Sequence, residues 1–225
     1  MKLARVGEIG AEKPALVDGE GILRDLSGVV ADIDAAVLSD AGLETLRAVD
    51  PASLPVLPDG VRYGAPVTGG HKFICIGLNY SDHAAETGAK PPKEPIIFMK
   101  GARPTGPNDP VSIPRGSVKT DWECELGVVI GTGGLYIPEE TALDHVAGYC
   151  VVNDVSERDY QANRGGTWTK GKSFPGFGPI GPWLVTRDEV GDPGDLKVWT
   201  DLNGKRMQDG TTSNLIFAVP HLIHY

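Results

Sequence analysis

The sequence predicts a mostly β domain that follows a small α/β unit, and three observations support this. Glycine and proline account for 30 and 18 of the 225 residues without a repeating period, which is typical of many turns and short strands. β-Branched and aromatic runs bounded by Gly, Pro, Asn or Asp recur after residue 72. Prolines between residues 51 and 60 favour an extended linker. We therefore predict a small N-terminal domain over 1–66 and a larger domain over 67–225.

In the first unit, short strands are expected at 3–6 and 15–17. The Asp-Gly-Glu-Gly sequence at 18–21 predicts a tight hairpin into a strand at 22–23. Apolar residues at helical spacing predict a helix over 29–49 with an interruption near 39–40.

The second unit is expected to be rich in strands. Asn203-Gly204 is the strongest hairpin signal in the chain. The expected strands cover 72–78, 95–99, 122–130, 148–155, 181–185, 196–202 and a run from 206 onward. The expected helices cover 81–87, 139–146 and 214–225, the last with Pro220 inside it.

Charge and composition exclude several classes of protein. The formal net charge is −9 and the basic residues are scattered, which disfavours nucleic-acid binding. No apolar run is long enough for a membrane span, and the first residues lack a signal-peptide pattern, so a cytoplasmic protein is expected. Cys75, Cys124 and Cys150 lie in apolar surroundings and are predicted to be buried thiols.

Two acidic residues lie on one strand face. Glu123 and Glu125 alternate with apolar residues, so both point to the same side of the predicted strand 122–130. Like charges this close raise each other's pKa unless a cation lies between them. A solvated face of an edge strand is the alternative interpretation.

Asp154 ends another apolar strand and supplies a third carboxylate. Three carboxylates without an accompanying His or Cys pair form an oxygen-only site suited to Mg²⁺, Mn²⁺ or Ca²⁺. A turn or helix-cap role is the alternative for Asp154 alone.

A candidate general base follows Asn79-Tyr80. If Ser81 caps a short helix that Gly88 ends, His83 and Glu86 are neighbours on one helical face. A carboxylate in this position orients the imidazole and raises its basicity. An exposed surface pair is the alternative.

A glycine-rich stretch around residues 167–174 carries Lys172, which could reach the carboxylates or a bound anion. A solvated loop lysine is the alternative. The other histidines show no partner pattern and receive no role: His71, His145, His221 and His224.

Taken in order, these segments resemble the fumarylacetoacetate hydrolase family across residues 71–225. The matching blocks are 77–80 with His83 and Glu86, 95–100, Glu123-x-Glu125, 153–154 with 158–161, 172–174 and 181–183.

The resemblance implies a mixed β-sandwich roll, a homodimer, and an Mg²⁺ or Mn²⁺ ion held by Glu123, Glu125 and Asp154. It also implies a lid helix with a catalytic His83–Glu86 dyad. It further makes Lys172 the family's catalytic and substrate-binding lysine, and Gln161 a substrate-binding glutamine. The family normally continues into a further turn and loop, so the sequence is expected to be a fragment that lacks the C-terminal part of the domain.

The resemblance also implies an enzyme that hydrolyses a carbon–carbon bond in a 2-oxo acid. The expected substrate is an acylpyruvate or a 2,4-diketo-3-deoxy sugar acid, and the expected products are pyruvate and a carboxylic acid. Two alternatives stay open. One is decarboxylase, isomerase or lyase chemistry on a related 2-oxo acid, and the other is a noncatalytic binding protein on the same fold.

Overall fold

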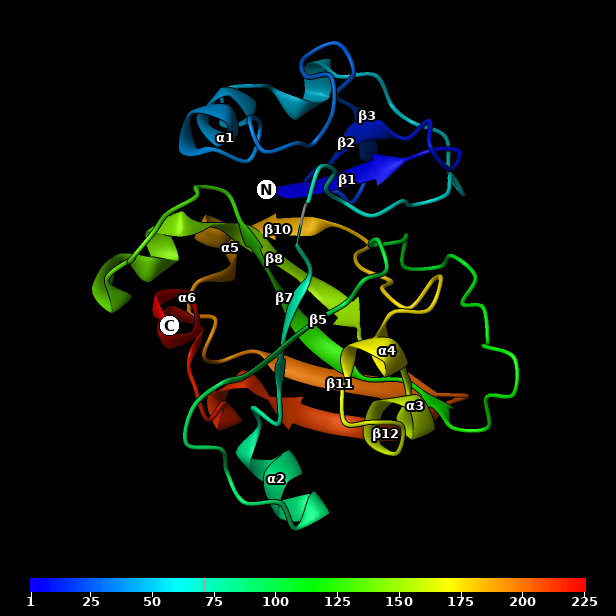
Figure 1. Ribbon diagram of the computed structural model, residues 1–225. Helices are drawn as coiled ribbons and strands as arrows, with labels where there is room; N and C mark the ends of the chain where they lie inside the picture. The colour runs from blue at the N-terminus through cyan, green and yellow to red at the C-terminus, as the bar shows by residue number, and fades with distance from the viewer. Residues whose placement is uncertain (71) are drawn as a thin grey trace.

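The computed structural model describes residues 1–70 and 72–225, and His71 lies outside them. Its centre is a six-stranded antiparallel sheet in the order β3-β2-β1-β10-β8-β7 (Figure 1). The strands are β1 (Lys2–Val6), β2 (Lys13–Val17), β3 (Leu23–Asp25), β7 (Cys124–Ile130), β8 (Val146–Asn153) and β10 (Leu184–Thr186). The architecture is mixed α/β around one large sheet.

The N-terminal strands extend the sheet of the larger unit. Strand β1 pairs with β10 through Lys2 opposite Val185 and Leu3 opposite Leu184. Leu3 and Leu184 are fully buried in one apolar cluster, which also includes Leu43 of the first unit. The first unit is therefore attached through both backbone pairing and a shared core, and the division at residue 66 stays a prediction.

Three two-stranded sheets and several short helices complete the chain. The sheets join β4 (Ile74–Gly77) to β5 (Ile96–Met99), β6 (Thr120–Asp121) to β9 (Ser156–Glu157), and β11 (Lys197–Leu202) to β12 (Lys205–Thr211). The α-helices are α1 (Asp40–Arg47), α2 (Ser81–Thr87), α3 (Arg158–Ala162), α4 (Thr169–Lys172), α5 (Arg187–Val190) and α6 (Val219–His224). The 3₁₀ helices are η1 (Pro51–Ser53), η2 (Glu139–His145) and η3 (Thr212–Asn214).

The predicted helix over 29–49 is wrong in its first half. Helix α1 begins only at Asp40, where the Ser39 hydroxyl accepts a hydrogen bond from the Gly42 N–H. Before it, the Asp34 carboxylate accepts the N–H groups of Ala36 and Val37. Such local side-chain bonds compete with helical backbone bonds, so this stretch forms turns.

The predicted C-terminal helix over 214–225 is also too long. It is divided into η3 and α6, and Pro220 lies in the first turn of α6, where its missing N–H costs nothing. Between them, Phe217 is held by both polar atoms of the Asn79 side chain, at 2.9 and 3.0 Å. This contact holds Phe217 in a bend between η3 and α6, so no continuous helix runs through residues 215–218.

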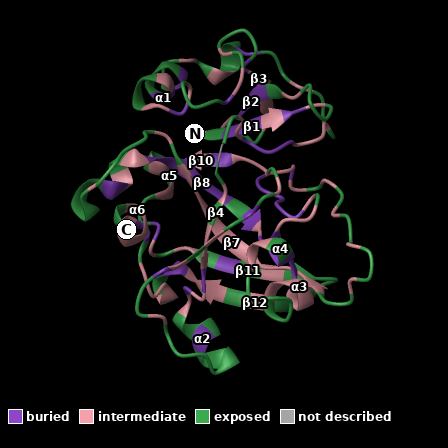
Figure 2. Ribbon diagram, in the orientation of Figure 1, coloured by how far each residue is buried: buried purple, intermediate pink, exposed green. Residues whose placement is uncertain are grey.

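Burial follows the sheet, as Figure 2 shows for β8 and β10, whereas helix α2 is mostly exposed. Cys150 is buried as predicted, but Cys75 and Cys124 are only half-buried. Across the described residues, every helix is too short or too polar to span a bilayer.

Candidate active site

The register of β7 and β8 brings the acidic residues together. Cys124 lies opposite Asn153, so Glu123 at the start of β7 faces Asp154 at the end of β8. The Asp154 N–H donates to the Glu123 carbonyl at 2.8 Å. Glu125 lies one residue into β7. Two segments that are distant in the sequence therefore supply neighbouring carboxylates.

Lys172 contacts this cluster directly. It lies in α4, and its Nζ donates to Glu123 Oε2 and to Asp154 Oδ2, each at 2.7 Å. Lys172 is 2% exposed, so the alternative of a solvated loop lysine does not hold. The ammonium group therefore lies between Glu123 and Asp154, whereas the sequence suggested a cation between Glu123 and Glu125.

A second lysine, Lys100, is buried on the other side of Asp154. Its Nζ donates to Asp154 Oδ1 and, at 3.2 Å, to the Val155 carbonyl. Both oxygens of Asp154 are thus bound by lysines, which keep its pKa below the usual value although burial alone would raise it. Lys100 has no predicted role among the candidate site residues. The one sequence feature that could have pointed to it is its position directly after the apolar run of β5.

Arg158 binds the other oxygen of Glu123. Its guanidinium donates to Glu123 Oε1, to Asp121 Oδ2 at 2.8 and 3.0 Å, and to the Gln161 side-chain oxygen at 3.2 Å. Gln161 therefore lies next to the cluster, and its role in binding a substrate stays a prediction. Arg158 and Asp121 were given no role from the sequence, and their ion pair joins residues 37 positions apart.

Glu125 is the least compensated of the three carboxylates. Burial, together with repulsion from Glu123 and Asp154, raises its pKa to about 8. In the chain as described, no Lys or Arg nitrogen comes within ion-pair distance of it. Tyr80 lies beside it, and burial and the Glu125 charge raise the pKa of the Tyr80 phenol.

The donor set fits a divalent cation in its chemistry. Glu123, Glu125 and Asp154 offer only carboxylate oxygens, and they lie close enough to raise the pKa of Glu125. In this arrangement, lysine and arginine nitrogens occupy the oxygens of Glu123 and Asp154. Accordingly, no group of three His, Cys, Asp or Glu side chains among residues 1–70 and 72–225 is arranged around a common metal position.

The predicted His83–Glu86 pair is present but stands apart from the cluster. His83 Nδ1 lies 3.8 Å from Glu86 Oε2 on helix α2, and the two side chains are 58% and 82% exposed. Tyr80, not Ser81, is the N-cap residue. No hydrogen bond or ion pair among the described residues joins either side chain to the carboxylates. Figure 1 shows α2 projecting from the lower end of the molecule.

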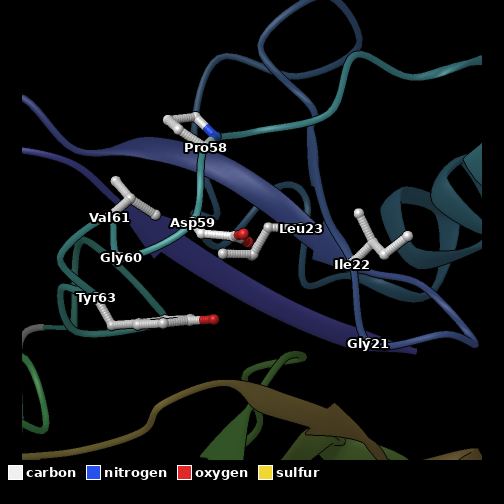
Figure 3. A pocket seen from close by; sticks show the side chains of 8 residues that line it. All are labelled: Gly21, Ile22, Leu23, Pro58, Asp59, Gly60, Val61 and Tyr63. Carbon is white, nitrogen blue, oxygen red and sulfur yellow. The ribbon is translucent and has the colours of Figure 1, made fainter.

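Two cavities lie away from the carboxylates themselves. One, of about 290 Å³, is bounded by β5 and residues 166–169. Phe98 connects it to the site, since its ring lies 5.2 Å from Lys172 Nζ and packs edge-on against Trp168. The other, of about 190 Å³, lies in the first unit beside Tyr63 (Figure 3).

Comparison with known proteins adds a family match. Residues 72–225 match the profile described as fumarylacetoacetate (FAA) hydrolase C-terminal. A protein from Burkholderia lata that is named only as a hydrolase is 58% identical to this chain over 226 aligned residues. The alignment covers 100% of this chain and 80% of that protein.

Two solved structures are also similar over the whole chain. Fumarylacetoacetate hydrolase from the psychrophile Exiguobacterium antarcticum is 32% identical with a TM-score of 0.85, and 80% of its chain is covered. Maleylpyruvate hydrolase from Sphingobium sp. SYK-6, solved with a manganese(II) ion and pyruvate, is 26% identical with a TM-score of 0.81, and 81% of its chain is covered.

Proposed function

The chain belongs to the fumarylacetoacetate hydrolase family, and from this premise we propose that it hydrolyses a carbon–carbon bond of a 2,4-dioxo acid. The products are pyruvate and a carboxylic acid, and the substrate is an acylpyruvate or a 2,4-diketo-3-deoxy sugar acid of sugar-acid catabolism. The observation that carries the proposal is the cluster of Glu123, Glu125 and Asp154 around the buried Lys172.

Glu123, Glu125 and Asp154 are proposed to hold Mg²⁺ or Mn²⁺. The manganese in the Sphingobium maleylpyruvate hydrolase supports this choice of ion. When bound, the ion acts as a Lewis acid for the oxygens of a 2-oxo acid.

The cationic side chains suit an anionic substrate. Lys100, Lys172 and Arg158 bring three positive charges that pair with Asp154 and Glu123, and Asp121 shares Arg158. A divalent cation in addition gives the site an excess of positive charge, which favours a carboxylate ligand. Lys172 and Gln161 are the side chains proposed to contact it.

His83 is proposed as the general base. Its Nδ1 faces Glu86, so Nε2 is the nitrogen left to accept a proton from water. That water adds to the C4 carbonyl of the substrate, the C3–C4 bond breaks, and C3 of the departing pyruvate enolate takes up a proton. Because α2 stands apart from the carboxylates, this role requires α2 to close over the substrate.

Decarboxylation or isomerisation of a related 2-oxo acid is the second candidate. Neither reaction needs an activated water, which agrees with the separation of His83 from the carboxylates. Hydrolysis keeps precedence because the dyad is present.

The experiment is a substrate screen of the purified protein with acylpyruvates, measuring pyruvate with lactate dehydrogenase and carbon dioxide in parallel. We expect one pyruvate and one carboxylic acid for each substrate consumed. Exhaustive chelation should stop turnover, and Mg²⁺ or Mn²⁺ should restore it. Carbon dioxide or an isomer without pyruvate would select the second candidate, and full activity after chelation would remove the metal. Substrate binding without turnover would indicate a noncatalytic protein.

We also propose a cytoplasmic homodimer. The outer face of the β4–β5 ribbon exposes Ile74, Ile97 and Met99 at 54%, 53% and 41%, an apolar surface that a second copy could cover. Light scattering after size-exclusion chromatography measures the mass directly, and a monomer at micromolar concentration would contradict this assembly.

A further inference from the structure

One glutamine of the β11–β12 hairpin binds the edge of the large sheet through both atoms of its amide. Gln208 Oε1 accepts the Cys124 N–H at 2.9 Å, and Gln208 Nε2 donates to the Cys124 carbonyl at 2.7 Å. The two residues are 84 positions apart in the sequence. Strand β7 is the last strand of the sheet, so its outward N–H and C=O groups require partners. The glutamine amide supplies both, as a neighbouring strand would.

The position of Cys124 gives this contact its significance. Cys124 lies between Glu123 and Glu125, the two glutamates of the carboxylate cluster. The Glu123 N–H is itself held by the Asn153 side-chain oxygen at 3.2 Å. Two amide side chains, one from each side of β7, therefore determine how the Glu123–Cys124 backbone is oriented.

We propose that Gln208 is a positioning residue for the cation site, and that it acts by fixing the peptide groups between Glu123 and Glu125. This inference rests on the proposed function, since the relative orientation of Glu123 and Glu125 affects function only if the two glutamates bind a cation together. A rotation of either Cys124 peptide group would turn one glutamate relative to the other. Groups that orient metal ligands in this way typically contribute 10–100-fold to metal affinity.

The test is Mn²⁺ titration of the full chain by calorimetry, with electron paramagnetic resonance of the bound ion as a second readout. Gln208→Met keeps the length and volume of the side chain and removes both hydrogen bonds to Cys124, together with the one that Gln208 Oε1 accepts from the Thr200 hydroxyl at 3.3 Å. We expect its Mn²⁺ dissociation constant to rise about 10–100-fold. Gln208→Asn keeps the amide but is one methylene too short to reach Cys124, so its Mn²⁺ dissociation constant should also rise. It replaces the Met variant as the test if that variant folds poorly.

Val198→Ala is the matched control for stability. Val198 lies on the same hairpin and is buried, at 7% exposure. Its side chain has no hydrogen-bonding group, so the replacement changes packing alone. Thermal unfolding should show Val198→Ala to be destabilised by the lost packing, whereas its Mn²⁺ affinity should stay at the wild-type value.

The outcomes separate this inference from the function on which it rests. If the wild-type protein binds no Mn²⁺, the metal assignment itself fails. If the wild type binds Mn²⁺ and both Gln208 variants bind it equally well, the positioning role of Gln208 is wrong. If Val198→Ala weakens binding as much as Gln208→Met, general loosening of the hairpin accounts for the effect, which also overturns the inference.

Discussion

Replacing Lys100 by methionine should destabilise the fold by about 3–5 kcal/mol, the usual cost of removing one partner from a buried ion pair. The Lys100 side chain is fully buried, and its ammonium group binds only Asp154 and the Val155 carbonyl among the described residues. Methionine fills a similar volume, so loss of packing contributes little. The main cost is an Asp154 oxygen and a carbonyl left without a donor in a buried place.

Urea unfolding followed by circular dichroism measures this free energy. Lys90→Met is the control, because Lys90 is exposed and its replacement should change stability by less than about 0.5 kcal/mol. The double variant Lys100→Met with Asp154→Asn should lose less than the sum of the two single losses, because the two side chains interact. A Lys100→Met protein as stable as the Lys90→Met protein would refute the assignment of Lys100 as the partner of Asp154.

Three further predictions concern the site and its attachment to the first unit. Glu123→Ala should lose Mn²⁺ binding in calorimetry, whereas Lys172→Met should keep the ion and lose turnover; equal loss of the ion in both would contradict separate roles. His83→Gln should keep Mn²⁺ affinity and lower turnover about 10²–10⁴-fold, and near-normal turnover would exclude His83 as the base. Asp109→Asn should cost about 1.5–3 kcal/mol at neutral pH in urea unfolding, because Arg62 donates two hydrogen bonds to Asp109, at 2.6 and 2.7 Å. The hydrogen bonds from Arg62 lower the pKa of Asp109 against the opposing effect of burial. The difference in unfolding free energy between wild type and Asp109→Asn should therefore be complete above about pH 4 and disappear as the pH falls through the lowered pKa. A difference that persists at low pH would contradict this.

The strands were predictable from the sequence because apolar runs and turn residues are local signals. The hairpin at Asn203-Gly204 joins β11 to β12 as expected, with Asn203 at a φ of 51° and Gly204 at 80°. The convergence of Glu123 and Asp154 was likewise predictable, since each lies at an end of an apolar strand.

Contacts between distant residues set the features that the sequence did not reveal. Phe217 lies in a bend that Asn79 holds, although the local pattern favours a helix. Helix α4 was read as a loop, yet it places Lys172 in the interior. Lys100 looked like an ordinary polar residue after a strand, and its ion pair requires Asp154, which is 54 residues away. In each case the contact that decides the structure joins residues far apart in the sequence, so local sequence patterns do not predict it.

The uneven distribution of charge within the cluster leads to one more conclusion. Asp154 is held by two lysines and Glu123 by a lysine and an arginine, whereas Glu125 has only the Tyr80 phenol beside it. Burying a carboxylate with so little compensation is costly, which is why its pKa rises to about 8. A cation bound beside Glu125 would relieve this cost. The strand that carries Glu125 is also the one that Gln208 holds, so the least compensated charge of the site lies next to the peptide groups that Gln208 binds.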